Sequence, residues 1–242
     1  TQTTMKPKFA LIMFCMLILA SCSDDETSAY KCDDCADTPE ALAVNDNSGK
    51  GIYKGLVIGS SGTMKFNIAN DGTYSATLSL DGEIYELTTE NVFNSEGGFE
   101  GYFYGTMNTT DDIEIGFYAS ATGSVYYTFS IDIPGHEDAY IEVYKETSDA
   151  LVRVFEGEYR GDASGTFNMV VQGSNWSVAA RDDLDLTGQD QSYFEGTVNS
   201  NEELVCDCGD VEITGSIDGD NISGDWEGGN DDSGSWSGKR TL

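Results

Sequence analysis

Two pairs of closely spaced cysteines carry the clearest chemical potential in this sequence. Cys32 and Cys35 are separated by two residues, and Cys206 and Cys208 by one. Four thiolates can hold a zinc ion, and the same side chains can instead form two disulfides. A one-residue spacing is unusual among zinc ligands, and a bridge across it is strained relative to ordinary disulfide geometry. The chemistry of these cysteines therefore depends on the compartment in which the protein folds.

The first residues predict export from the cytoplasm. We expect translation to begin at Met5, with residues 1–4 as read-through. Lys6 and Lys8 precede an uninterrupted apolar run that is too short for a comfortable permanent membrane helix. Residues 1–21 are therefore expected to be a secretory signal peptide.

Export favours oxidation of the four cysteines, so we expect disulfides rather than a metal site or another cofactor. Cross-links from Cys32 and Cys35 to Cys206 and Cys208 would close a long loop, which gives the largest stabilisation on the chain-entropy model. Local bridges within each pair are the second arrangement. A four-thiolate zinc site is the third interpretation.

The end of the signal segment is more specific. Leu19-Ala20-Ser21-Cys22 resembles the lipobox of bacterial lipoproteins, and the acidic run 23–26 resembles the export tag of Bacteroidota-type surface lipoproteins. The resemblance implies that Cys22 is lipidated and becomes the first residue of the mature chain. It also implies a protein of the outer membrane that is held by its lipid and exposed at the cell surface. Several acyl chains on one cysteine anchor a protein firmly.

The charge balance excludes one class of partner. The chain has 43 acidic and 12 basic residues among its 242, and its formal net charge is −31. Nucleic acids and anionic membrane faces are repelled by such a charge. The partners that remain are a membrane reached through the lipid anchor, and a glycan, a small molecule or another protein.

Beyond a tether, the chain predicts an all-β fold. Residues 22–49 are polar and acidic and lack sustained apolar periodicity, so we expect a flexible tether there. From Gly51 onward, apolar residues alternate with a period of two. Tight-turn sequences interrupt the alternation, as at 70–72 (Asn-Asp-Gly) and 81–82 (Asp-Gly). This pattern is typical of an antiparallel meander.

A frame of glycine, any residue, aromatic residue, any residue and glycine occurs five times. Because side chains alternate between the faces of a strand, the two glycines and the aromatic residue share one face. A bare glycine lets a ring from the neighbouring strand lie close to the backbone, which suits a strongly curved sheet. The central aromatic residues of the frames are Tyr53, Phe103, Tyr159, Trp226 and Trp236.

The second half of the chain repeats the first. Four short sequences recur in the same order, beginning at Gly51 and Gly157, Ser61 and Ser164, Phe99 and Phe194, and Asp112 and Asp210. We expect two tandem copies of one antiparallel meander, at residues 50–147 and 152–242. Each copy has about eight strands, which is enough for a small barrel or sandwich. The last two sequences are three residues further apart in the second copy, which predicts a loop insertion that contains its cysteines.

The glycine-aromatic frames and the ending 234–238 (Gly-Ser-Trp-Ser-Gly) are similar to those of avidin-like and lipocalin-like barrels. The resemblance implies a barrel architecture. A calycin-like carrier of this kind would hold a small molecule inside its barrel. No binding residue is transferred by position.

Aromatic side chains are the main candidates for ligand contact. Consecutive aromatic residues put rings on both faces of a strand, which selects Tyr102, Tyr104 and Tyr126. Trp176 is a fourth candidate. The two frame tryptophans, Trp226 and Trp236, are expected to fill the interior or to line a barrel mouth.

We expect no catalytic residue. His136 is the only histidine, and no nucleophile motif accompanies it. Carboxylate pairs such as Glu195 with Glu212 arise by chance in so acidic a chain. The sequence thus predicts a non-enzymatic, lipid-anchored surface protein with an interaction or ligand-binding role. The alternative is a carrier with a small molecule inside one barrel, and the third hypothesis is a glycan-active enzyme.

Overall fold

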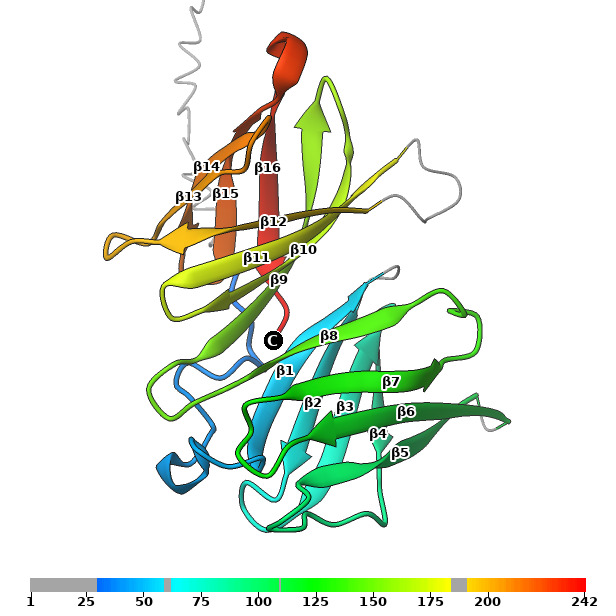
Figure 1. Ribbon diagram of the computed structural model, residues 1–242. Coiled ribbons are helices and arrows are strands. Elements are labelled where there is room, and N and C mark those ends of the chain that lie inside the picture. Colours follow the sequence, from blue (N-terminus) through cyan, green and yellow to red (C-terminus); the bar gives the residue numbers. More distant parts are fainter. Residues whose placement is uncertain (1–29, 59–61, 109, 184–190) are drawn as a thin grey trace, which may run out of the picture.

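The computed structural model of the protein describes residues 30–58, 62–108, 110–183 and 191–242. Within these ranges the chain forms two stacked units built almost entirely of antiparallel strands (Figure 1). We call the unit made by β1–β8 the open barrel and the unit made by β9–β16 the closed barrel. The all-β fold class and the tandem meanders expected from the sequence are confirmed.

The open barrel is a meander whose strands divide between two sheets. Its strands are β1 (Gly51–Ile58), β2 (Gly62–Ile68), β3 (Tyr74–Leu80), β4 (Glu83–Leu87), β5 (Phe99–Met107), β6 (Asp111–Ala119), β7 (Tyr126–Asp132) and β8 (Tyr140–Lys145). In the described residues, one sheet has the order β4-β3-β2-β1-β8 and the other the order β5-β6-β7. A single bridge, Thr88 to Tyr104, joins β5 to the end of β4, and Thr128 Oγ1 donates to Ile141 O at 2.5 Å across the other seam.

The closed barrel is a meander in which every strand pairs on both sides. Its strands are β9 (Val152–Gly161), β10 (Gly165–Gln172), β11 (Asn175–Asp182), β12 (Gln191–Val198), β13 (Glu203–Asp207), β14 (Glu212–Asp218), β15 (Asn221–Glu227) and β16 (Ser233–Arg240). Pairing of β16 with β9 closes the ring. The short 3-10 turn η2 (Gly229–Asp231) connects the last two strands.

The Asp81-Gly82 turn and the glycine-aromatic frames of the closed barrel act as their sequences predict. Asp81 and Gly82 both have positive φ, at 53° and 82°, as a two-residue hairpin turn requires. In the closed barrel, a Cβ atom added to Gly224 would lie 2.6 Å from the ring of Trp236, and one added to Gly234 would lie 2.5 Å from the ring of Trp226. Each ring therefore occupies the space that a side chain on the neighbouring strand would need.

The two interiors are packed differently. The open barrel holds one continuous core, in which the ring of Phe66 stacks on Phe117 with centroids 4.5 Å apart. Tyr53 meets Phe117 edge to face at 4.9 Å and donates its hydroxyl to Gly49 O. Large rings from both sheets thus fill the open barrel. The closed barrel has smaller residues, such as Ala180, at inward positions.

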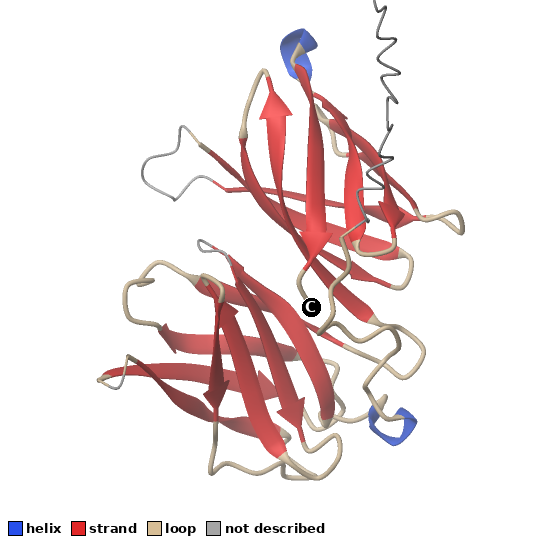
Figure 2. Cartoon of the chain, turned by 180° about the vertical axis from the view of Figure 1, so that it is seen from behind, coloured by secondary structure: helices blue, strands red, loops and turns tan. Residues whose placement is uncertain are grey.

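Strand β1 is buried on both faces because the closed barrel packs against its outer side. All of its residues are buried. An apolar cluster joins the two units, and it contains Leu56, Ile58, Val152, Val154, Val170 and Ala179. Asn168 adds a hydrogen bond from Nδ2 to Val57 O at 3.2 Å. The C-terminus lies between the barrels, where Leu242 packs on the same cluster (Figures 1 and 2).

Residues 30–50 form a strap that runs along both barrels, with the short 3-10 turn η1 (Ala43–Asn45) inside it. At the closed barrel, Tyr30 donates its hydroxyl to Arg240 O at 2.9 Å. At the open barrel, the buried ammonium of Lys145 donates to the carbonyl oxygens of Asn45 and Asp46, both at 2.8 Å. The expectation of a flexible tether is therefore wrong for residues 30–49, because their backbone groups are bonded to side chains of the barrels.

Four charged residues hold the middle of the strap, and we call them the Glu146 cluster: Glu40, Lys54, Lys65 and Glu146. Lys54 Nζ lies 2.8 Å from Glu146 Oε2 and 2.9 Å from Glu40 Oε2. Lys54 and Glu146 are almost fully buried, with side-chain exposures of 1% and 0%. Burial opposes the charge of Glu40, but hydrogen bonds from Lys65 and Lys54 lower the pKa of its carboxyl.

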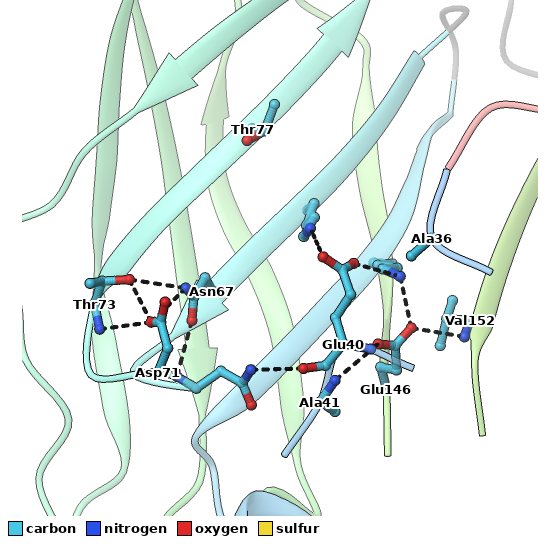
Figure 3. Close-up of polar contacts among 12 residues, drawn as sticks. Ala36, Glu40, Ala41, Asn67, Asp71, Thr73, Thr77, Glu146 and Val152 are labelled. Carbon is cyan, nitrogen blue, oxygen red and sulfur yellow. Dashed lines mark hydrogen bonds and ion pairs between the residues drawn. The ribbon is translucent and has the colours of Figure 1, made fainter. Parts of the chain in front are cut away.

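Glu146 also accepts hydrogen bonds from the backbone. The N–H groups of Glu40 and Ala41 donate to its Oε1 at 2.5 and 3.2 Å, and the N–H of Val152 donates to its Oε2 at 3.1 Å (Figure 3). One carboxylate thus joins the strap, the open barrel and the first strand of the closed barrel.

One of the repeated sequences does not fall on equivalent strands. Gly51 and Gly157 lie on the first strand of each barrel, Asp112 lies at the start of β6, and Asp210 lies in the bend that precedes β14. Phe99, however, opens β5, whereas its expected counterpart Phe194 lies on β12, one strand earlier in its barrel. The predicted loop insertion is therefore wrong: the additional residues belong to strand β13, and Cys206 is a buried wall residue of that strand.

Candidate functional site

A cavity of about 310 Å³ lies inside the closed barrel. Its lining is mostly apolar and comes from inward positions of six strands: Phe167, Met169, Val178, Phe194, Ile213, Trp226 and Trp236. Inward residues alternate along each strand, so the sequence period of two selects this set directly. The volume is at the lower end of the range found for small-molecule sites.

The cavity is closed at one end of the barrel. There the interior is filled by Val171, Trp176, Val198, Leu204, Ile217 and Ile222, which are buried but do not line the cavity. The indole N–H of Trp176 donates to Thr197 O at 3.2 Å, which fixes the ring across the floor. The same end carries the 173–174 and 219–220 turns and receives the beginning of the strap, where Cys32 N donates to Asp220 Oδ2.

The other end forms the mouth, and its lining is more polar. Tyr159, Asp182 and Ser192 line the cavity near the ends of their strands, and Ala163 lines it from the turn between β9 and β10. Burial, followed by the charges of Asp182 and Asp183, raises the pKa of the Tyr159 phenol to about 12. Tyr159 therefore keeps its proton at neutral pH and is a hydrogen-bond donor at the entrance.

A second donor in the lining has no acceptor. The Nε1 atom of Trp226 is buried and has no hydrogen-bond partner in the described part of the chain. Its ring meets Tyr159 edge to face, with centroids 6.5 Å apart. A buried donor without an acceptor costs about 1–3 kcal/mol. A ligand with an acceptor near the mouth would relieve this cost.

A cleft of about 350 Å³ also lies between the barrels. Its lining is more polar and includes Glu156, Asn168 and Arg181 on the outer wall of the closed barrel. Burial and the charge of Asp81 raise the pKa of Glu156. Since the cleft is polar and Asn168 already bonds to Val57 O, it serves the contact between the barrels.

The aromatic residues selected from the sequence do not gather at the cavity. Trp176 lies in the filled end of the barrel, below the cavity, and is not one of the residues that line the cavity. Tyr126 packs against the core of the open barrel, 5.2 Å from the ring of Tyr53. Tyr102 and Tyr104 lie on the outer wall of β5. Trp226 and Trp236, which the frames marked for the interior or a mouth, do line the cavity.

The structure pairs the cysteines locally. Disulfides join Cys32 to Cys35 and Cys206 to Cys208, with Cα atoms 5.3 and 5.4 Å apart. The expected cross-links are wrong because the first pair lies at the closed end of the barrel, while Cys206 pairs with Ile213 toward the mouth. The two cysteine pairs therefore lie about one strand length apart, roughly 20 Å. A four-thiolate zinc site shared by the two pairs is excluded as well. Cys22 lies outside the described residues.

The remaining polar candidates from the sequence do not gather at the cavity. His136 Nε2 lies 3.4 Å from Asp81 Oδ2, between two loops of the open barrel. Glu195 and Glu212 lie on β12 and β14, which β13 separates. Within residues 30–58, 62–108, 110–183 and 191–242, no group of three or more His, Cys, Asp or Glu side chains could hold a metal ion. The same ranges contain no helix long and apolar enough to cross a membrane.

Fold and site together define a tandem-barrel protein with one filled interior and one interior cavity. Comparisons of the chain with known protein families, with curated proteins and with solved structures found no match. Its function must therefore be inferred from the geometry of its own residues.

Proposed function

We propose that the protein is a non-enzymatic, lipid-anchored binding protein whose closed barrel takes up a small, largely apolar molecule. The observation that carries this proposal is the difference between the two interiors. Aromatic rings fill the open barrel, whereas the closed barrel has an apolar cavity of about 310 Å³ between its floor and its mouth. An apolar cavity with a few polar groups is the usual form of a small-molecule site.

The polar groups of the cavity indicate how a ligand would be oriented. Its apolar part would lie against Phe167, Trp226 and Trp236. A hydrogen-bond acceptor would lie near the mouth, where Tyr159 and the Trp226 indole are donors. The acidic residues beside Tyr159 disfavour an anion there. The ligand class is thus a neutral apolar molecule with an acceptor at one end.

Filling the cavity should abolish uptake. Ala180 lines the cavity, so Ala180→Phe puts a ring into the space that the ligand needs. We expect the variant to bind the neutral probe N-phenyl-1-naphthylamine at least ~10-fold more weakly, which is a loss of about 1.4 kcal/mol. All three tryptophans, Trp176, Trp226 and Trp236, belong to the closed barrel. Energy transfer from tryptophan to the probe therefore measures binding at this barrel.

Thr214→Phe is the matched control, since Thr214 is exposed on the outer wall of β14. It adds the same ring outside the cavity and should leave probe affinity unchanged. Equal binding by the Ala180→Phe variant and the wild type would show that the probe, and with it the proposed ligand class, does not use the cavity.

The lipid anchor is the second part of the proposal and is supported by the Leu-Ala-Ser-Cys sequence that ends at Cys22. Cys22→Ala should leave the protein unacylated, so that it moves from the membrane fraction to the soluble fraction. Cys15→Ala removes a cysteine from the signal segment and should leave fractionation unchanged. Persistent membrane association of the Cys22→Ala variant, with no acyl chain detected by mass spectrometry, would contradict the anchor.

A further inference from the structure

The outer wall of the β5-β6-β7 sheet carries a group of touching aromatic rings that is separate from the cavity. We call it the aromatic face; its members are Tyr102, Tyr104, Tyr118, Tyr127 and Phe129. Centroid distances between neighbouring rings run from 5.0 Å, for Tyr118 and Tyr127, to 6.3 Å, for Tyr127 and Phe129. Gly116 lies on β6 between Tyr102 of β5 and Phe129 of β7 and pairs with both. The ring of Phe129 lies over this glycine.

These rings remain in contact with solvent. Tyr104 and Tyr127 are 49% and 50% exposed, and the other three are partly exposed. The closed barrel packs against β1, β8 and the apolar cluster, on the other sheet of the open barrel. No described segment of the chain therefore covers the aromatic face. Exposed aromatic groups of this kind are typical of interaction sites.

Carboxylates border the rings within the same sheet. Glu114 is the cross-strand partner of both Tyr104 and Asp132, and Glu100 is the partner of Tyr118. In the part of the chain that the structure describes, no lysine or arginine forms an ion pair with these three acids. Partial desolvation, the Glu114 charge and Tyr102 raise the pKa of Tyr104. The face thus combines negative ring faces with carboxylates that have no basic partner.

We propose that the aromatic face is a docking surface for a basic, arginine-bearing segment of a partner protein. A guanidinium gains from stacking on tyrosine rings and also pairs with carboxylates in a planar fork. The formal net charge of −31 attracts such a segment from a distance. A neutral glycan would stack on the rings and donate hydrogen bonds to the carboxylates but would not neutralise their charge, and a second copy of this acidic chain would bring like charges together. Charge complementarity therefore favours the basic partner.

The test separates local recognition from general attraction by charge. A fluorescent peptide of alternating arginine and serine is titrated with the full chain in detergent at physiological ionic strength. The same peptide with citrulline in place of arginine keeps the shape without the charge. We expect the arginine peptide to bind and the citrulline peptide to bind too weakly to measure.

Ring removal at constant charge gives the decisive comparison. The triple variant Tyr102→Ser, Tyr104→Ser, Tyr127→Ser leaves the net charge unchanged and should weaken binding roughly 10- to 100-fold. Tyr193→Ser removes an exposed tyrosine of the closed barrel and should have no effect. Circular dichroism of the triple variant should show the wild-type fold, since the substituted side chains are solvent-accessible.

Three outcomes would overturn the proposal. The first is equal affinity of the triple variant and the wild type for the arginine peptide. The second is equal affinity of the arginine and citrulline peptides. The third is that the wild type binds a neutral oligosaccharide, or associates with itself, and the triple variant does not. Each would assign the face to another occupant or to none. Uptake of the naphthylamine probe by the closed barrel is independent of all three results.

Discussion

Replacement of Glu146 by alanine is expected to lower the free energy of unfolding by about 3–5 kcal/mol. The substitution leaves the ammonium of Lys54 buried, with only the partly exposed Glu40 to balance it. It also removes the acceptor of the N–H groups of Glu40, Ala41 and Val152. Chemical denaturation followed by circular dichroism, which reports both barrels, measures the change.

Two further variants make this prediction specific. Glu158→Ala removes a carboxylate whose partner Arg160 is mostly exposed, and it should change stability by less than about 1 kcal/mol. In the double variant Lys54→Met, Glu146→Leu, no buried charge is left without its partner. It should be clearly more stable than Glu146→Ala alone. A loss below about 1 kcal/mol in Glu146→Ala would contradict the role assigned to this carboxylate.

A side chain at Gly224 is expected to cost about 2–4 kcal/mol, because the closed barrel has no room for it. A Cβ atom at this position would collide with the carbonyl oxygen of Thr214, and it would lie 2.6 Å from both Gly215 Cα and the ring of Trp236. Two of these three neighbours are backbone atoms, and the third is a ring wedged between strands. Gly224→Val should therefore shift the denaturation midpoint measured by tryptophan fluorescence, which reports this barrel alone.

Gly229→Val is the matched control for this effect. A Cβ atom at Gly229 would meet no atom within 4 Å, and the residue lies in the turn after the same strand. Its expected cost is within about 0.5 kcal/mol. Similar losses in the two variants would mean that backbone entropy, rather than the close approach of Trp236, explains the effect.

The architecture could be predicted from local sequence because each strand obeys a rule that involves only its neighbours. A period of two defines inward positions, and Asp81-Gly82 defines a turn. The frames centred on Trp226 and Trp236 predict rings that lie over bare glycines. The misplaced match between Phe99 and Phe194 shows the limit of this approach, since Phe-Glu-Gly suits any inward strand segment.

The binding features depended on information that local sequence does not contain. Whether a barrel is filled depends on the summed volume of all inward residues, and Ala180 acquires a role only because its neighbours leave space beside it. Disulfide pairing depends on which strand ends meet, which spacing does not specify. The docking of the strap depends on Lys54 and Glu146, which are more than ninety residues apart and read separately as surface charges.

The strap meets the closed barrel at the floor and not at the mouth, and this determines how a tethered molecule would meet its surroundings. Cys22 and Tyr30 are eight residues apart, so a fully extended chain between them spans roughly 28 Å at most. The segment that would lead to a lipid on Cys22 thus leaves the closed barrel at its floor end, at Tyr30. The entrance lies at the opposite end of the closed barrel, about one strand length away, roughly 25 Å. The proposed anchor and the entrance of a guest molecule would therefore belong to opposite ends of the closed barrel.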